Sequence, residues 1–227
     1  KPAGLTAAQV AAVADVAARA GLLFAEAYMY RCHPQIARLL EILKSGEIGT
    51  PRHIRAQFGF NAGFNPASRL YDRALGGGGI MDVGGYPVSL ARLVAGAAVG
   101  RAFADPVTVK GSGIVGQSGV DEVAYGLLGF AGGFTAEVAC AIARTMDNRA
   151  VIEGDKGRIE LVDPWVPGRN AGPSDATISV TVGGETRVEV LRSPQHLFAF
   201  EAELFSRTIA EGATEALVER VVYLGFE

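Results

Sequence analysis

A chain of 227 residues with 49% hydrophobic and 20% charged residues has the balance of a globular protein with a sizeable core. Its formal net charge of −3 gives no general electrostatic attraction to nucleic acid or to an anionic membrane surface. No apolar run is both long enough and free enough of charge to span a bilayer, so the sequence predicts neither a nucleic acid nor a membrane as partner.

The chain opens with an alternation of helix and strand signals. Thr6 and Gln9 resemble a capping box at the start of an alanine-rich run, which predicts a helix that ends at Ala20. The apolar run 22–27 predicts a short buried strand. A second helix is expected over residues 34–45, because a proline occupies its first turn and a glycine stands just beyond its end.

Residues 52–60 alternate between polar and apolar side chains, which predicts a strand with one wet face. The polar side carries His53, Arg55 and Gln57, and the other side carries Ile54, Ala56 and Phe58. The stretch 61–79 that follows is a long loop rich in glycine, asparagine and charged residues. Such a loop is more often a functional lid or binding loop than an idle connection.

From Gly100 onward, strand signals alternate with turn residues, which favours an antiparallel meander over further strand–helix–strand units. Strands are expected at residues 103–109, 122–130, 134–143, 150–153, 158–162, 177–182 and 186–191, and a closing helix at 197–210. The pattern predicts the α+β class, with a large, open, mostly antiparallel sheet covered by helices on one face. Ala124, Leu128 and Ala136 are expected on the other face, where another subunit would cover them.

The best evidence of chemistry is the run Gly76–Gly79 followed by Asp82 and Tyr86. Consecutive glycines accept positive φ and allow another molecule to lie close against the backbone. If the segment after them is helical, Asp82 and Tyr86 lie one turn apart on one face and point at whatever the glycines admit. Two alternatives stay open: a flexible loop that leads into a core helix, and an acid that caps free N–H groups.

A resemblance to a known family rests on Lys1–Pro2 and on four further segments in order. These segments are TAAQVAAVADVAARAG, FAEAYMYRCHPQ, EIGTPRHIRAQF and SRLYDRALGGGGIMDVGGYPVSLAR. In them the chain resembles the C-terminal part of a Gfo/Idh/MocA-type oxidoreductase, strongly from Lys1 to about Val94 and more loosely across the later sheet. Members pair an N-terminal Rossmann domain, which holds NAD or NADP, with a C-terminal domain built on a large open sheet.

The resemblance implies a division of the chain into two parts. Residues 1–28 would be the tail of the dinucleotide-binding domain, comprising its last helix and strand. Residues 29–227 would form the C-terminal substrate-binding and oligomerisation domain. Consistent with this division, no G-x-G-x-x-G fingerprint stands between a strand and a helix near the start of the chain.

The resemblance also implies roles for individual residues. Lys1 matches the lysine that contacts substrate and nicotinamide, so Lys1 and Pro2 are the expected cofactor-binding residues. Asp82 matches the acid of the D-x-x-x-H/Y motif and Tyr86 its catalytic last position, and with Lys1 they form the expected catalytic set. Inositol-dehydrogenase-like members carry histidine where Tyr86 stands, which puts an inositol substrate in doubt.

The implied reaction is hydride transfer between NAD or NADP and a secondary alcohol of a sugar or related diol. Oxidising an alcohol also removes a proton from its oxygen, so a base is needed beside the hydroxyl. Lys1 would favour the phenolate form of Tyr86, and Asp82 would bind a neighbouring hydroxyl or hold Lys1. Arg69 and Arg31 fall where the family builds the pocket beside the nicotinamide, and are the expected substrate-binding residues.

Other enzyme classes fit less well. A short-chain dehydrogenase would have lysine four positions after Tyr86, where Leu90 stands. The three histidines are widely scattered and no H-E-x-x-H occurs, so no metal site is expected. The triplet 111–113 is predicted to be a turn and not the elbow of a serine hydrolase. The alternative from another class is a non-catalytic substrate-binding or oligomerisation module without redox activity.

Cysteine usage and the opening of the chain bear on its location. Cys32 and Cys140 lie far apart, which is typical of a reducing compartment and not of a disulfide framework. Asp15 and Arg19 interrupt the alanine-rich opening before the uncharged core of a signal peptide can form. We therefore expect a cytoplasmic protein that forms a homodimer or a higher homo-oligomer through its open sheet.

Overall fold

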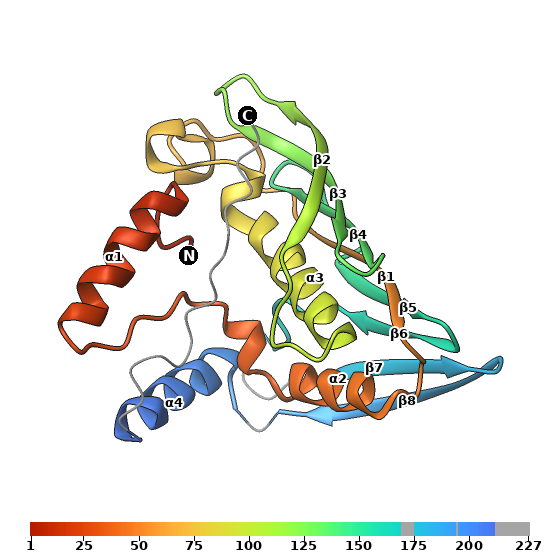
Figure 1. Cartoon of the computed structure of the whole chain (residues 1–227). Coiled ribbons are helices and arrows are strands. Elements are labelled where there is room, and N and C mark those ends of the chain that lie inside the picture. The colour runs from red at the N-terminus through yellow and green to blue at the C-terminus, as the bar shows by residue number, and fades with distance from the viewer. Residues whose placement is uncertain (169–174, 194, 212–227) are drawn as a thin grey trace.

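The computed structural model describes residues 1–168, 175–193 and 195–211. Residues 169–174, 194 and 212–227, which belong to the predicted domain 29–227, lie outside the described residues. Figure 1 shows one large twisted sheet with helices packed on one side of it, while the first helix stands apart from the sheet. The expected α+β class is confirmed.

The first helix, α1 (Ala7–Arg19), begins where its capping residues predict. The Thr6 hydroxyl accepts a hydrogen bond from the backbone N–H of Gln9 (3.2 Å), and the Gln9 side chain accepts one from the N–H of Leu5 (2.7 Å). The strand predicted at residues 22–27 is not formed. A strand needs a neighbouring backbone for its ladder, and no strand of the described sheet pairs with this segment.

The second predicted helix is confirmed as α2 (Pro34–Ser45). It follows a single 3-10 turn, η1 (Met29–Cys32), and His33 caps it, because the ring Nδ1 accepts the backbone N–H of Gln35 at 3.1 Å. Gly46 ends it in the left-handed conformation with a φ of 71°. The helix buries one face, which consists of Gln35, Ile36, Leu39, Ile42 and Leu43.

The strands of the described chain form a single open sheet in the order β2-β3-β4-β1-β5-β6-β7-β8. They are β1 (Pro51–Gly59), β2 (Pro106–Val115), β3 (Asp121–Phe130), β4 (Thr135–Ala141), β5 (Arg149–Gly154), β6 (Gly157–Val162), β7 (Asp175–Val182) and β8 (Glu185–Arg192). Among these described strands only β1 and β4 pair in parallel. Parallel neighbours need a long connection, and here it runs through helix α3 (Gly85–Ala98) and two further strands. The mostly antiparallel sheet is therefore confirmed.

One turn prediction is wrong. Gly111–Ser112–Gly113 lies inside β2, which begins and ends later than the predicted 103–109. The triplet pairs with residues 124–126 of β3. A Cβ at Gly113 would lie 2.7 Å from the Val123 carbonyl oxygen, so this glycine permits a close approach of two strands.

The helices cover one face of the sheet, as Figure 1 shows for α2 and α3. In β1, Ile54, Ala56 and Phe58 are buried on this face, and the predicted alternation is confirmed. The core on this side also includes Leu90 and Val94 of α3. It is the main hydrophobic core of the described chain.

The prediction for the uncovered face is wrong in its residues. Ala124, Leu128 and Ala136 are buried in the helix-side core. The side chains that β3 exposes are Tyr125 and Leu127, at 43% and 55%. Side chains alternate along a strand, so an assignment that is off by one residue exchanges the two faces completely.

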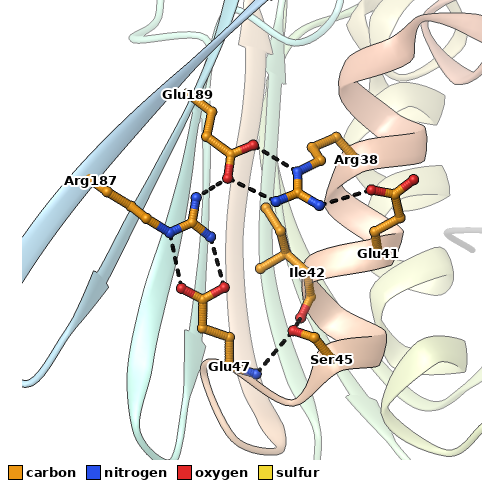
Figure 2. Close-up of polar contacts among 7 residues, drawn as sticks. All are labelled: Arg38, Glu41, Ile42, Ser45, Glu47, Arg187 and Glu189. Atoms are coloured by element: carbon orange, nitrogen blue, oxygen red, sulfur yellow. Dashed lines mark hydrogen bonds and ion pairs between the residues drawn. The ribbon is translucent and has the colours of Figure 1, made fainter.

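An ion-pair cluster fastens the last strand to α2 (Figure 2). Glu189 of β8 accepts hydrogen bonds from Arg38 of α2 at 2.7 and 2.9 Å and also pairs with Arg187. Arg187 in turn donates to both carboxylate oxygens of Glu47 at 3.0 and 2.7 Å, just beyond the end of α2. Arg38 also pairs with Glu41. The cluster thereby ties β8, the last strand in the order of the described sheet, to the helix layer.

The closing helix is confirmed as α4 (Leu197–Ala210), with the predicted bounds. His196 caps it, since the ring Nδ1 accepts the backbone N–H of Phe198. The helix packs against η1. Within the described ranges, no helix combines the length and the apolar character needed to cross a bilayer.

Candidate active site

The loop between β1 and α3 is held in place at its middle. It contains two 3-10 turns, η2 (Arg69–Tyr71) and η3 (Arg73–Leu75). Tyr71 is buried in a small cluster with Val120 and Ile142, separate from the main core. The loop lies at the same end of the molecule as the start of α1 (Figure 1). Its ordered middle positions both the residues before the glycine run and the run itself.

The glycine run is packed against the chain itself. Gly76 and Gly78 have φ of 70° and 118°, which other residues rarely adopt. A Cβ at Gly76 would overlap the Leu5 side chain, and one at Gly77 would lie 2.6 to 2.9 Å from three carbonyl oxygens of residues 69, 70 and 72. The close approach that Gly76 and Gly77 permit is therefore to the N-terminal segment and to the loop.

A π turn begins the helix that carries the two predicted catalytic side chains. This turn, η4 (Ile80–Gly84), contains Asp82, and α3 follows directly with Tyr86 in its first turn. π turns are rare and occur frequently at functional sites. The Asp82 side chain is 11% exposed and Tyr86 is 4% exposed. Both residues thus lie at the buried start of one helix.

Lys1 reaches the same place from the N-terminal segment. Its ammonium lies 4.6 Å from the centre of the Tyr86 ring, in a cation–π contact. The backbone N–H of Ala3 donates to Glu26 Oε1 at 2.9 Å and ties this segment to residues 22–28. Lys1 and Pro2 are joined by a cis peptide bond. The fold therefore brings an amine and a phenol ring together that are far apart in the chain.

Several charges act on the Lys1 ammonium. Lys1 is exposed as a whole residue, but burial of its side-chain end lowers the Lys1 pKa and is the largest influence on it. Asp82 and Glu26 raise that pKa, and Arg69 lowers it. The ammonium therefore loses its proton more easily than that of an ordinary lysine.

The Tyr86 side chain is packed within an aromatic cage. The rings of Tyr28, Tyr30, Phe58 and Trp165 surround it, with centroids 5.2 to 6.1 Å from its own. Its hydroxyl donates to the Met29 thioether sulfur at 3.2 Å. The phenol oxygen is therefore in the packed interior and bonded to a weak acceptor.

Arg69 is the second cation of the cluster. Its guanidinium donates to Asp82 Oδ1 at 2.9 Å, and its side chain is 68% exposed. The middle of the loop is thus linked to the π turn. Together the contacts place Lys1, Arg69, Asp82 and Tyr86 in one cluster.

Arg31 lies beside a different hollow. It donates to the Ser89 hydroxyl at 3.2 Å and lies 4.8 Å from the centre of the Phe103 ring. It lines a cavity of about 690 Å³ between the segment 25–40 and α4. The lining of that cavity includes Tyr28 but not Asp82, Arg69 or Tyr86.

Sequence reasoning did not single out Met29, Tyr28, Trp165 and Asp121, although each shapes the cluster. Asp121 does so by accepting the backbone N–H of Ile80 at the start of the π turn. Met29 and Tyr28 stand in a short aromatic run before Arg31, which was a weak signal. Trp165 lies in a turn after β6, and its indole N–H donates to the Gln57 carbonyl at 2.8 Å. Contacts of this kind join segments far apart in the chain, so no periodic sequence pattern predicts them.

The described residues do not contain a group of three or more His, Cys, Asp or Glu side chains placed to hold a metal ion. What the cluster offers is a lysine with a lowered pKa, a carboxylate and a phenol. Such a set can bind a hydroxyl group and exchange a proton with it.

The fold and the cluster define a class: an open-sheet α+β domain with cationic, acidic and phenolic groups gathered at the start of one covering helix. The description "GFO/IDH/MocA C-terminal domain" matches residues 36–160. The chain belongs to this family. Its curated relatives carry the names of dehydrogenases and oxidoreductases.

Two relatives illustrate the match. The chain is 32% identical over 167 residues to trans-1,2-dihydrobenzene-1,2-diol dehydrogenase of Mus musculus, covering 74% of this chain and 48% of the relative. It is 30% identical over 215 residues to D-xylose 1-dehydrogenase (NADP(+)) 2 of Haloferax volcanii, covering 94% of this chain and 62% of the relative. The chain thus spans about half the length of the dihydrodiol dehydrogenases that it matches.

Solved structures show the same fold. Aldose-aldose oxidoreductase from Caulobacter crescentus, complexed with glycerol, superposes with a TM-score of 0.80 at 24% identity over 96% of this chain and 62% of that chain. KijD10, a 3-ketoreductase from Actinomadura kijaniata in complex with NADP and TDP-benzene, superposes with a TM-score of 0.78 at 23% identity. That match covers 95% of this chain and 63% of the ketoreductase.

Proposed function

We propose that the protein carrying this chain is an NADP- or NAD-dependent oxidoreductase that acts on a secondary alcohol of a sugar or related diol. The observation that carries the proposal is the meeting of Lys1, Asp82 and Tyr86 at the start of one helix. The names of the relatives support it, since they include a dihydrodiol dehydrogenase and an NADP-dependent xylose dehydrogenase.

A dinucleotide-binding domain belongs to the same proposal, with residues 1–28 as its tail and residues 29–227 as the substrate-binding domain. Two observations support the division: α1 stands apart from the sheet, and the segment 22–27 finds no ladder partner among the described strands. The chain also covers only 48% of the dihydrodiol dehydrogenase. The coding sequence upstream of Lys1 tests this division directly.

The cluster fits the nicotinamide end of such a cofactor. Other atoms of the chain occupy the space beside the glycine run, so the run does not form a phosphate-binding loop. Lys1 would hold the nicotinamide end together with Pro2. A bound nicotinamide supplies or accepts the hydride.

The proton is handled by this chain's own residues. Tyr86 is the proposed proton carrier: its phenolate takes the alcohol proton in oxidation, and its phenol returns a proton to the alkoxide in reduction. This role requires a substrate oxygen to reach the Tyr86 hydroxyl, which here donates to the Met29 sulfur. Lys1 lies against the ring of this phenol, and Asp82 binds a neighbouring hydroxyl or holds Lys1.

Replacing Tyr86 with phenylalanine in the longer protein tests this role. We expect Tyr86→Phe to lower kcat by about 100-fold or more, because proton transfer by a positioned side chain contributes about that much. The thermal midpoint should change little, since the ring that fills the aromatic cage stays. Tyr125→Phe, which removes a hydroxyl from the uncovered face of the sheet, is the matched control. An unchanged kcat in Tyr86→Phe would remove Tyr86 from the mechanism.

A second experiment separates the enzyme from a non-catalytic binding or oligomerisation module. We expect no change in NADPH fluorescence when this 227-residue chain is titrated, because no G-x-G-x-x-G run stands between a strand and a helix. The matching letters at residues 111–116 lie in β2 and at its end. Micromolar binding would contradict this expectation. Absence of any NADP- or NAD-dependent turnover in the longer protein, tested with sugars and diols, would favour the non-catalytic module.

The remaining parts of the proposal concern partners and location. We propose a homodimer or higher homo-oligomer formed through the uncovered face of the sheet, a small sugar or diol as substrate, and a cytoplasmic location. The exposed apolar side chains of that face support the homo-oligomer. Two free cysteines that lie far apart in the sequence support the cytoplasmic location.

A further inference from the structure

The helix that carries Asp82 and Tyr86 has no capping side chain of its own. The other three long helices of the described chain are capped by the residue just before them: Thr6 for α1, His33 for α2 and His196 for α4. The π turn η4 instead begins after Gly79, which has no side chain, and no local side chain caps it. The first N–H groups of a helix need partners from elsewhere in such a case.

Asp121, the first residue of β3, supplies those partners. Its Oδ2 accepts the backbone N–H of Ile80 at 2.7 Å, across 41 residues of sequence. The Gly79 N–H acts on the same carboxylate and helps to lower its pKa. A negative charge at this position also complements the positive end of the helix dipole. A distant strand thus performs the capping that the glycine run cannot.

The last two glycines of the run make room for this carboxylate. A Cβ at Gly78 would overlap Asp121 Oδ1, and one at Gly79 would lie 3.2 Å from Oδ2. The close approach to Gly78 and Gly79 is therefore made by Asp121. Burial raises the pKa of this carboxyl group, and its hydrogen bonds to backbone N–H groups lower it.

The position of Asp82 follows from the position of this helix start. Asp82 stands two residues after Ile80, and its own N–H donates to the Gly78 carbonyl at 3.0 Å. Asp121 therefore holds the backbone at the start of the π turn. A shift of the turn would move Asp82 relative to Lys1 and Arg69, and a misplacement of about 1 Å can be costly for catalysis.

We propose that Asp121 is a positioning residue, whose carboxylate holds the start of the helix so that Asp82 and Tyr86 face Lys1. The catalytic part of this inference rests on the function proposed above. The structural part does not, because it concerns the helix start and the ammonium of Lys1 in this chain. The two parts can therefore be tested separately.

The structural part is tested in the 227-residue chain by amide hydrogen exchange and by NMR titration of ¹³C-methylated lysines. In Asp121→Ala we expect the Ile80 amide to exchange about tenfold faster or more, because it loses a charged acceptor. We also expect the Lys1 pKa to fall, because Asp82, which raises it, moves away. Unchanged exchange and an unchanged Lys1 titration would overturn the proposal.

Two further variants separate positioning from general destabilisation. Asp121→Asn keeps one acceptor oxygen without the charge, and it should give intermediate exchange and a partial change at Lys1 even if Asp121→Ala fails to fold. Glu160→Ala removes a half-buried, ion-paired carboxylate on β6, far along the sheet from β3. It should leave both readouts unchanged. A change at Lys1 in Glu160→Ala equal to that in Asp121→Ala would overturn the proposal.

The catalytic part is tested in the longer protein. With an active wild type, we expect Asp121→Ala to lower kcat about tenfold or more, with a smaller change in KM and partial recovery in Asp121→Asn. An unchanged kcat would overturn the catalytic part. If the wild type turns over no sugar or diol, the proposed function fails, whereas the exchange and titration experiments still decide whether Asp121 holds the helix start.

Discussion

At the scale of the residue, the position of Lys1 decides which charges of the cluster act on it. Its ammonium lies over the Tyr86 ring, with Asp82 and Arg69 acting on it in opposite directions. Burial lowers the Lys1 pKa most, so the folded chain holds this proton less tightly than the unfolded chain does. By linkage, the charged lysine lowers the free energy of unfolding at neutral pH, and stability is regained as the pH rises toward 10.5, the ordinary lysine pKa.

Two substitutions should move the Lys1 pKa in opposite directions. Asp82→Asn removes a charge that raises the Lys1 pKa, so we expect that pKa to fall further; Arg69→Met removes a charge that lowers it, so we expect it to rise. NMR titration of ¹³C-methylated lysines measures both, with Lys1→Arg identifying the signal. Shifts of the same sign in the two variants would contradict the described arrangement of charges.

At the scale of the element, the ion-pair cluster of Figure 2 joins β8 to α2. Isolated surface ion pairs contribute little, because solvent screens them and two side chains must be immobilised. Here one carboxylate, Glu189, serves Arg38 and Arg187 at once, and its side chain is only 24% exposed. We therefore infer that this cluster contributes more to stability than a lone pair on a helix surface does.

Urea unfolding of two charge-neutralised variants tests this inference. We expect Glu189→Gln to lower the free energy of unfolding by about 1 kcal/mol or more, because two guanidinium groups lose their shared carboxylate. The control Asp15→Asn removes the exposed i, i+4 pair with Arg19 on α1 and should cost about 0.3 to 0.5 kcal/mol. Equal losses in the two variants would mean that the cluster adds nothing beyond an isolated pair.

At the scale of the whole molecule, helices cover one face of the sheet, and no described helix covers the other, which we call the bare face. The bare face exposes Leu127 at 55%, Val188 at 59% and Val190 at 53%. A groove of about 570 Å³ on this face is lined by charged and apolar side chains together, among them Arg55 and Leu127. Exposed apolar side chains beside charged ones agree with the interface between subunits proposed for this face.

A charge placed on this face should disrupt the proposed oligomer. We expect the wild-type chain to sediment as a dimer or larger species, and Leu127→Glu to shift it toward the monomer, because a carboxylate would be buried without a partner. Val16→Glu introduces the same charge at a 58% exposed site on α1, outside the sheet, and should leave the distribution unchanged. A monomeric wild type at the same concentration would rule out this use of the face.

Local signals in the sequence predict most of the elements. The bounds of α2 and α4 agree with the predicted 34–45 and 197–210, because caps, a leading proline and a terminal glycine act within a few residues. Turn residues likewise mark the hairpins after β3 and β5. The strand at 22–27 and the turn at 111–113 fail for one reason: both depend on whether a distant strand lies alongside.

The cluster is predictable only in part. The D-x-x-x-Y spacing and the leading Lys-Pro select Asp82, Tyr86 and Lys1 through resemblance to a family, and the structure places them together. No local pattern indicates that the Tyr86 hydroxyl meets Met29, or that the glycine run accommodates Asp121. Those contacts join residues 57 and 41 positions apart.

By itself, then, the sequence determines the class of fold and the order of most helices and strands, and through its resemblance to a family it nominates Lys1, Asp82 and Tyr86 for the proposed chemistry. The tertiary structure alone decides which face of the sheet is covered, which group caps the helix of Asp82, and which charges act on Lys1. The physical reason is that capping, burial and charge interaction depend on distance in space. Side-chain periodicity reports only on neighbours along the chain.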